Sequence, residues 1–527
     1  MAKTRRQLFS SFRPVPETAE TPRVRRPRSP STTPIDEQVM AKLPVVDVIK
    51  HIGAHPDDAS LPAVDPLVIL LNRCSFGFKE SEYQRALTLD YTGWLQEQLN
   101  YTSLDNSALE TSIASTLPRV SWTAAQLIAD AKTTGKNGQG ATELIAATML
   151  RQIFSTRQLY EVMVEFWTNH FNIAASAVPE IYYKVVDDRD VIRANALGSF
   201  PTMLKASARS LAMLYYLDNV SNTKSGPNEN YARELMELHT LGVEGGYSET
   251  DVSEVARCFT GWTVTGSAAN NPIFTFLASR HDTGVKTVLG NTIPANRGIE
   301  DGNQVLDILA SHPSTARYIA EKLCIRFIGQ HPQTTAIDQV AATYTATNGD
   351  ISAMLLTLFG STEFMASHDR KIRRPVEYLI GALRVVEPSL TGDYLSRLST
   401  RLVSLGQLHF KWPTPDGYPD EISDWMNSGA SLTRWNWVFG LAEDKISTGI
   451  RINIASLISS ANTAQLLVDQ LSARLLRRVL TTEDRDRFIN FAANGGSATV
   501  VLDATTINLR ARELIGLMLA SKYFQYR

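Results

Sequence analysis

The chain has 527 residues, of which 43% are hydrophobic and 20% charged, and its formal net charge at pH 7 is −2. This composition is ordinary for a globular protein, and a chain of this length can bury a large core. The near-neutral charge excludes a global attraction to nucleic acid or to an anionic membrane surface, so we expect no specific nucleic-acid binding. No run reaches the roughly 18 apolar residues of a membrane helix, so we expect no transmembrane segment.

Residues 1–40 are basic and rich in proline, with the cluster Arg23-Val-Arg25-Arg26-Pro-Arg28. They lack apolar periodicity, and we expect a disordered, solvated tail. Contact of this tail with an anionic surface is the alternative. The string Thr4-Arg5-Arg6-Gln7-Leu8-Phe9 resembles the start of a twin-arginine export signal, but no apolar region follows it. We therefore expect the cytoplasm by default, with export as the alternative.

The rest of the chain reads as a partly ordered lead-in over 41–65 and a single large helical domain over 66–527. We expect sub-boundaries near 300 and near 390–415. Apolar residues spaced by three and four predict helices. The predicted helices cover 80–87, 91–99, 141–170, 228–242, 248–260, 313–329, 350–360, 372–387, 430–442 and 504–522.

Strand signals are few. Residues 272–277 and 286–289 predict at most one small hairpin near 272–290. The alternation of strand and helix that a doubly wound sheet needs is absent. The expected fold class is therefore mainly α, a large array of many helices.

The three cysteines, Cys74, Cys258 and Cys324, lie far apart and form no C-x-x-C pair. This pattern does not support a zinc ribbon or a thioredoxin-like motif, and it argues against a disulfide framework. Each thiol is expected to be a small buried apolar residue.

His170 is the first candidate for chemistry. Leu159, Met163, Phe166 and His170 share one face of the predicted helix, so the histidine lies on an apolar stripe. A histidine in that position is usually a hydrogen-bonded core residue. The alternative is a metal ligand or an acid–base group that works near neutral pH.

Residues 228–242 are the stretch of the chain richest in polar and charged residues. Glu229, Arg233 and Glu237 are spaced by four and predict a ladder of ion pairs, either solvated or buried as a charge network. Glu234 and His239 flank the face that packs. One helix therefore cannot bring both side chains to a single metal without help from another segment.

Two further motifs follow. Ser248 and Asp251 resemble a capping box, so capping is the preferred role of Asp251. The pair His281-Asp282 precedes the predicted hairpin. Such a pair can ligate a metal or transfer protons, and it can equally brace a turn.

Long strings of the chain resemble one bacterial family, called domain of unknown function 1800. The strings are Leu70 to Gly77, Phe166 to Phe171, Tyr216 to Asn219, Asn228 to Gly242, Tyr247 to Asp251, Thr260 to Trp262, His281-Asp282, His312 to Arg317, Pro415 to Gly417 and Phe524 to Arg527. The resemblance implies no activity, because the family is named for lacking one. It implies a companion protein from a sulfatase-like uncharacterised family, whose genes often lie beside those of its members. Many members look exported, whereas this chain has no obvious signal peptide.

Two classes of function remain open. The first is an enzyme whose site lies between helices and performs hydrolysis or oxidation at a divalent metal such as zinc, iron or manganese, or acid–base chemistry. The metal candidates are His170, His239, His281 and Glu234, and the catalytic candidates are Glu234, Arg233, Glu237 and Asp282. Arg233 would orient a carboxylate or bind an anionic substrate.

The second class is a non-catalytic scaffold or partner-binding protein with a buried structural charge network. In that protein Trp425, Trp435 and Trp437 would belong to the core or to an interface. Polymer or carbohydrate binding on aromatic side chains is a third and weaker alternative.

Overall fold

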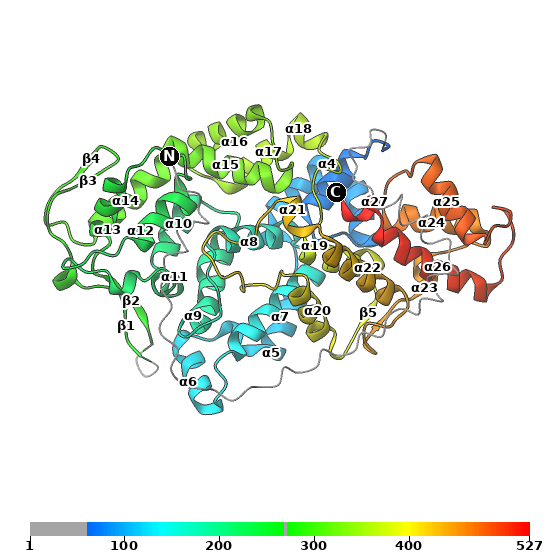
Figure 1. Ribbon diagram of the computed structural model, residues 1–527, viewed down its shortest axis with the longest axis horizontal. Helices are drawn as coiled ribbons and strands as arrows, with labels where there is room; N and C mark the ends of the chain where they lie inside the picture. Colours follow the sequence, from blue (N-terminus) through cyan, green and yellow to red (C-terminus); the bar gives the residue numbers. More distant parts are fainter. Residues whose placement is uncertain (1–60, 268–270) are drawn as a thin grey trace. The chain divides into compact units, whose positions relative to one another are not determined.

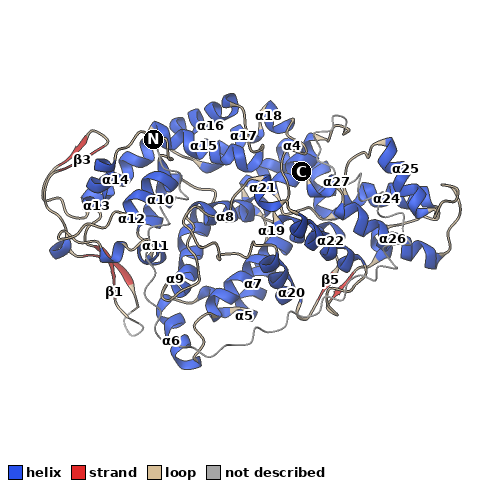
Figure 2. Ribbon diagram, in the orientation of Figure 1, coloured by secondary structure: helices blue, strands red, loops and turns tan. Residues whose placement is uncertain are grey.

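The computed structural model describes residues 61–267 and 271–527, which belong to one compact unit of the chain. The predicted tail and the lead-in up to residue 60 lie outside these residues. The described part is mainly helical, as the sequence predicts (Figures 1 and 2). None of its helices combines the length and the apolar character needed to cross a membrane.

The N-terminal helices include the predicted segments 80–87 and 91–99, one corrected segment over 141–170, and several helices that had no predicted counterpart. In chain order the N-terminal helices are α3 (Pro66–Cys74), α4 (Glu80–Leu99), η3 (Tyr101–Ser103), α5 (Ser107–Thr116), η4 (Pro118–Ser121), α6 (Ala124–Thr134), α7 (Gln139–Phe154) and α8 (Gln158–His170). Asp90 has a φ of 61° and separates the two predicted halves of α4. The single helix predicted over 141–170 is wrong, because Ser155 is extended and its hydroxyl accepts from the Arg157 amide at 3.0 Å.

The middle of the chain forms α9 (Glu180–Asp187), η5 (Asp188–Arg193), α10 (Phe200–Ala208), α11 (Leu211–Tyr216), η6 (Asn219–Ser221), α12 (Asn230–Glu234), η7 (Leu235–Thr240) and α13 (Glu249–Cys258). The predicted helix over 228–242 is thus divided. Its second half, η7, is a π-helix, in which the Leu241 amide bonds to the Met236 carbonyl. The wider turn changes which side chains of this segment face inward.

Strands form two hairpins where one was predicted. In the first hairpin β1 (Trp262–Thr265) pairs with β2 (Ile273–Phe276), with Trp262 opposite Phe276. In the second, β3 (Lys286–Val288) pairs with β4 (Asn291–Ile293), with Lys286 opposite Ile293. The expected pairing of 272–277 with 286–289 is therefore wrong, because each strand pairs with its nearer neighbour. The short strands β5 (Ser389–Leu390) and β6 (Ile450–Arg451) form a third antiparallel pair.

The remaining helices are η8 (Ala278–Arg280), α14 (Glu300–Ser311), α15 (Pro313–Phe327), α16 (Thr334–Thr347), α17 (Ile351–Phe359), α18 (Thr362–Met365), α19 (Pro375–Val386), α20 (Tyr394–Ser404), α21 (Ile422–Trp425), α22 (Ser428–Ala442), α23 (Ile454–Leu457), α24 (Ala464–Leu475), α25 (Thr482–Ala492), α26 (Ala504–Ala520) and α27 (Lys522–Gln525). Among them, α15, α17, α19, α22 and α26 match predicted segments closely, and the others had no predicted counterpart. Every residue of α19 is buried, and this helix packs against α7 and α22. Cys74, Cys258 and Cys324 are buried free thiols, as expected.

Candidate functional site

A cavity of about 180 Å³ lies among α8, α15, the start of α19 and the segment 405–421 that joins α20 to α21. Most of the residues that line it have polar or charged side chains. The lining residues are Glu165, Phe166, Asn169, His170, Lys322, Ile325, Arg326, Arg374, Asp416, Tyr418, Pro419 and Asp420. We call it the Lys322 cavity.

Helix α15 brings Lys322 to this cavity. The helix begins after His312, whose side chain accepts from the Ser314 amide, and Pro313 occupies its first turn. Tyr318, Lys322 and Arg326 follow at steps of four, so they share one face of the helix. The buried apolar residues that anchor the opposite side are Ala316, Ile319, Ala320 and Leu323.

The ammonium group of Lys322 is uncommitted. The side chain is half-buried, and its Nζ lies 5.4 Å from the centre of the Tyr318 ring. It makes no hydrogen bond or ion pair with any residue in the described part of the chain. Burial lowers the pKa of Lys322 to about 8, although Asp420 and Asp416 oppose this shift. A lysine in this state exchanges a proton readily near neutral pH.

His170 lies at the C-terminal end of α8, where it lines the same cavity and contacts His239. Its Nε2 is 3.0 Å from the His239 carbonyl oxygen, which can only accept, so Nε2 carries the proton. The other ring nitrogen, Nδ1, is buried and has no hydrogen-bond partner among the described residues. Burial, followed by the charge of Lys322, holds the pKa of His170 well below its usual value. The ring is therefore a neutral base at physiological pH.

His239 stands behind His170, with the two ring centres 6.1 Å apart. The side chain comes from the π-helix η7 and is buried. Burial and the nearby charge of Lys322 lower the pKa of His239 to about 3, so this ring is also neutral. Its Nε2 finds no hydrogen-bond partner in the described part of the chain.

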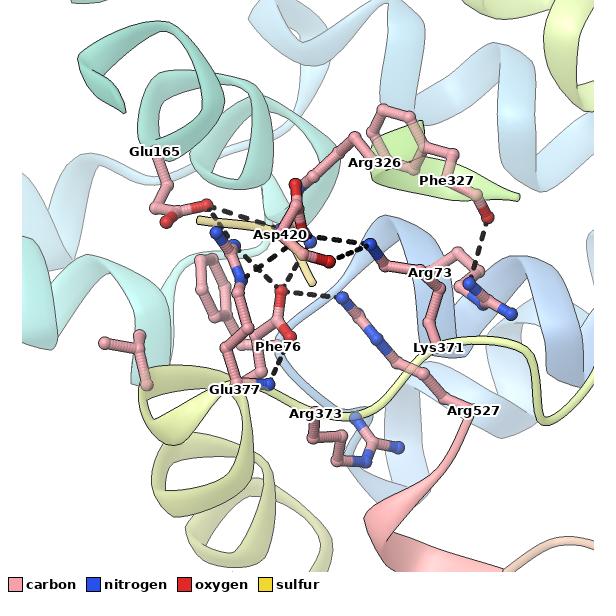
Figure 3. A network of polar contacts seen from close by, with 12 residues as sticks. Arg73, Phe76, Glu165, Arg326, Phe327, Lys371, Arg373, Glu377, Asp420 and Arg527 are labelled. Carbon is pink, nitrogen blue, oxygen red and sulfur yellow. Dashed lines mark hydrogen bonds and ion pairs between the residues drawn. The ribbon is translucent and has the colours of Figure 1, made fainter. Parts of the chain in front are cut away.

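A network of buried ion pairs lies next to the cavity and shares Glu165, Arg326, Arg374 and Asp420 with its lining (Figure 3). In the first turn of α19, the Oε1 of Glu377 lies 2.5 Å from Arg326, 3.0 Å from Arg374 and 2.6 Å from Arg527. Glu165 of α8 lies 2.7 Å from Arg374 and 3.4 Å from Arg326. Burial alone would raise the pKa of Glu377, but its three arginine partners hold it well below the usual value. The carboxylate therefore stays ionised and ties three segments together: the start of α19, helix α15 and the C-terminal residue.

Asp420 and Lys371 extend this network. The Lys371 ammonium is 2.9 Å from Asp420 Oδ1 and also donates to the Ile325 carbonyl oxygen at 2.9 Å. Burial lowers the pKa of Lys371 to about 8 despite the opposing charge of Asp420. Lys371 thus resembles Lys322 in its lowered pKa and differs from it in being bonded to Asp420 and to the Ile325 carbonyl.

The segment 405–421 is held against the end of α8 by a close backbone approach. Gly417 has a φ of +75°, and a Cβ at this position would lie 2.2 Å from the Asn169 carbonyl oxygen. Asp416, the residue before it, accepts from Trp412 Nε1 at 2.9 Å and from Thr414 Oγ1 at 2.5 Å. The Pro415-Asp416-Gly417 turn therefore fixes the position of one wall of the cavity.

The residues predicted from the sequence divide between this cavity and other places. Arg233 forms a surface ion-pair set, 3.2 Å from Glu229 and 2.7 Å from Glu249, and the Glu249 side chain is 78% exposed. Glu234 and Glu237 are half-buried on the same segment as His239. Asp251 caps α13 together with Ser248, as predicted.

His281 and Asp282 belong to a separate polar group beside the second hairpin. His281 Nε2 is 3.1 Å from the buried carboxylate of Asp301, which Lys286 approaches to 2.7 Å. Arg257 contacts Asp282 at 2.8 Å and, as the largest cause, lowers the pKa of Asp282 to about 2. Of the proposed metal ligands, His170 and His239 lie together, whereas His281 belongs to this separate group. In the described residues no group of three or more His, Cys, Asp or Glu side chains could hold a metal ion.

Sequence reasoning missed Lys322, Arg326, Arg374 and Asp420. One signal was present: the polar series Tyr318, Lys322 and Arg326 runs along one face of the helix at a constant step of four. No comparable signal marks Arg374 or Asp420, because their role depends on segments that meet only in the folded protein.

Comparison with known proteins gives a family and no activity. A family model described as "Protein of unknown function (DUF1800)" matches residues 69–526. No curated protein and no solved structure matches the chain.

Proposed function

Because the chain belongs to the DUF1800 family of proteins of unknown function, we propose its role from the site alone: an acid–base enzyme that acts on a small polar molecule in the Lys322 cavity. The observation that carries this proposal is the uncommitted ammonium of Lys322 in the wall of the cavity. Charged side chains in a folded protein are usually paired when they lose solvent. A lysine left unpaired beside an open volume is a candidate to meet a ligand.

Two groups of the cavity can transfer protons. Lys322 gives up or takes a proton near pH 8, and His170 Nδ1 offers a lone pair because its Nε2 proton is held by the His239 carbonyl. A proton donor and a proton acceptor on facing helices suit general acid–base catalysis. The ion pairs around Glu377 hold α8, α15 and α19 in place, and this rigidity supports a fixed geometry of the two groups.

The alternative is a scaffold whose buried charges are purely structural. The observation in its favour is that Glu377 and Glu165 are fully engaged with arginines and need no ligand. This alternative gives no role to an unpaired lysine in a cavity, and we therefore place it second. The expectation of hydrolysis or oxidation at zinc, iron or manganese stays a prediction, which metal analysis of the purified protein tests.

The proposal also includes the cellular compartment of the protein and a partner protein. We place the protein in the cytoplasm, with export as the alternative, and propose a companion from the sulfatase-like family that the resemblance implies. Cell fractionation and co-purification of the tagged full-length chain measure both.

The proposal is tested by profiling metabolites with the purified protein. A bacterial small-molecule extract is incubated with the wild type, with Lys322→Met and with Lys322→Arg, and compounds are followed by mass spectrometry. We expect at least one compound to be consumed by the wild type and to be consumed about 100-fold more slowly or worse by both variants, because loss of a general acid or base costs at least that factor. Arginine keeps the charge but does not release a proton.

The matched control is Lys136→Met, because Lys136 is exposed and distant from the cavity wall. It should consume the same compound at the wild-type rate. The proposal is overturned if the wild type consumes nothing, or if Lys322→Arg works as well as the wild type.

A further inference from the structure

Lys322 and Lys371 form a natural pair for comparison. Lys371 is buried and Lys322 is half-buried, and the charge of Asp420 acts on both. The Lys371 ammonium is bonded to Asp420 and to the Ile325 carbonyl, whereas the Lys322 ammonium has no such partner among the described residues. Only Lys322 lines the cavity. A primary amine that is freed from hydrogen bonds and partly withdrawn from water is a nucleophile as well as a base.

The lining of the cavity holds three basic side chains, Lys322, Arg326 and Arg374, and three acidic ones, Glu165, Asp416 and Asp420. The ion-pair network behind it adds Lys371 and Arg527 on the basic side and Glu377 on the acidic side, so positive charge exceeds negative charge by one. Arg326, Arg374 and Arg527 share the single carboxylate of Glu377, and only the first two also reach Glu165. Arg73 and Arg373 are buried close by and donate to neutral groups. A small molecule with an anionic group is therefore favoured in this cavity over a neutral or cationic one.

From this geometry we propose that Lys322 captures a small carbonyl compound bearing an anionic group, of the 2-oxo acid or oxo-carboxylate class, as an imine. The inference rests on the proposed function, because it names the class of substrate of the same cavity. In an imine the substrate carbon is bonded to nitrogen, which makes an adjacent proton or bond easier to release. An acid–base site beside such a carbon could then remove that proton.

The steps balance without any further reactant. The Nζ lone pair of neutral Lys322 attacks the carbonyl carbon, and a C–N bond forms as the C=O π electrons move to oxygen. Both Nζ protons pass in turn, by way of His170 Nδ1, to the oxygen: the first gives the carbinolamine, and the second lets the oxygen leave as water as the C–O bond breaks and the nitrogen lone pair forms the C=N bond. The product is the imine of Lys322, and hydrolysis by the same route reversed restores the amine.

The test uses glyoxylate, a small anionic aldehyde, with sodium cyanoborohydride to reduce any imine to a stable secondary amine. Full-length protein is treated at pH 8, digested, and examined by mass spectrometry at each lysine. We expect the adduct at Lys322 to form far faster than at Lys371 or at the exposed Lys136. A pKa near 8 leaves roughly 100-fold more neutral amine at that pH than an ordinary lysine has.

Glycolaldehyde, a neutral aldehyde of similar size, tests the anionic preference. We expect it to modify Lys136 as readily as glyoxylate does, but to modify Lys322 more slowly. Lys322→Met should lose the fast adduct while keeping the wild-type melting temperature and the adduct at Lys136. The inference is overturned if Lys322 reacts no faster than Lys136, or if the two aldehydes modify Lys322 equally.

The two proposals fail in different ways. If a metabolite is consumed in a Lys322-dependent way but no adduct forms at Lys322, the imine proposal is wrong and the acid–base enzyme is still supported. A fast adduct at Lys322, with no metabolite consumed in the profiling experiment, would remove the enzyme and leave a carbonyl-binding lysine.

Discussion

At the scale of single residues, the contribution of a charged side chain to stability depends on its burial and on its ion-pair partners. Glu377 is surrounded by Arg326, Arg374 and Arg527, and together they cross-link distant segments. Arg233 and Glu249 make an ion pair of similar length at the surface. Solvent weakens the surface pair, whereas removing the shared buried carboxylate leaves several guanidinium groups without a counter-charge.

This contrast predicts the stability of two glutamine variants. Glu377→Gln should lower the free energy of unfolding by about 3–5 kcal/mol, because the arginines keep their desolvation cost and lose their attraction. Glu249→Gln, the matched surface variant, should change it by less than about 1 kcal/mol. Urea unfolding of the three proteins measures both values. Equal losses in the two variants would contradict a structural role for the network.

The sequence predicted part of the site at this scale. Phe166 and His170 lie on a buried helix face as the apolar stripe indicates, and His170 does line the cavity. Lys322 was missed because a lysine on a helix usually points to solvent, and neither its burial nor its lack of a partner can be read from the sequence. The local roles of Ser248 and Asp251 were predictable, because a cap depends on neighbours in the chain.

At the scale of elements, the segment 405–421 has no regular structure, and the close backbone approach of Gly417 is one of the contacts that hold it against the end of α8. Gly417 approaches the Asn169 backbone so closely that no side chain fits, and its φ is +75°. Gly406 lies in the same segment with a φ of +78°, but a Cβ there would meet nothing within 4 Å. Comparing the two positions therefore separates two free-energy costs of a side chain: that of the left-handed backbone, which both share, and that of a steric clash with Asn169, which only Gly417 has.

Alanine at each position gives a prediction for this segment. Gly406→Ala should cost about 1–2 kcal/mol, the price of a left-handed conformation for an L-residue. Gly417→Ala should cost more than Gly406→Ala and should also move Asp416 and Tyr418 away from α8. Thermal unfolding measures the first effect, and hydrogen exchange of residues 405–421 measures the second. Equal behaviour of the two variants would show that the close approach to Asn169 does not hold the wall.

The positions of several helices were predictable from the sequence, whereas breaks and π-helical turns within the predicted helices were not. The helices α13, α15 and α26 lie within a few residues of their predicted ranges, because apolar spacing and caps mark them clearly. The break between α7 and α8 has neither proline nor glycine at Ser155–Arg157 to announce it. The π-helix η7 also left no signal, and it is the element that brings His239 to His170.

At the scale of the whole molecule, buried neutral histidines make stability depend on pH. Burial lowers the pKa of His239 to about 3 and that of His409 to about 4, and it holds that of His170 well below 6.5. In the unfolded chain a histidine takes up a proton near pH 6.5. Between about pH 6 and pH 4 the unfolded state therefore binds more protons, so the free energy of unfolding falls as the pH falls.

One histidine can be removed to test this dependence. His409→Gln can keep the bond to Gln152, which His409 Nε2 approaches to 3.0 Å. The slope of unfolding free energy against pH near pH 5 should then decrease by about 1.4 kcal/mol per pH unit, one proton's worth. His331→Gln, at an exposed position, is the control and should leave the slope unchanged. An unaltered slope in His409→Gln would mean that His409 is protonated in the folded protein.

Contacts between segments that lie far apart in the chain were the hardest feature to predict from the sequence. Residues 165–170, 322–326, 374 and 416–420 converge on one cavity, although more than 200 positions separate the first from the last. The mainly helical class follows from local spacing and is confirmed. The identity of the neighbours around Lys322 follows from tertiary packing, for which one sequence carries no direct signal.

The most direct test of the account is the pH dependence of the reactivity of Lys322. The full-length protein is pulse-labelled with acetic anhydride from pH 6 to pH 11, and modification of each lysine is followed by mass spectrometry. His170, His239, Asp416 and Asp420 surround Lys322, and burial is the largest influence on it. The account predicts a midpoint at about pH 8 for Lys322 and little labelling of the bonded Lys371. A midpoint near 10.4, the value of an ordinary lysine, would contradict it.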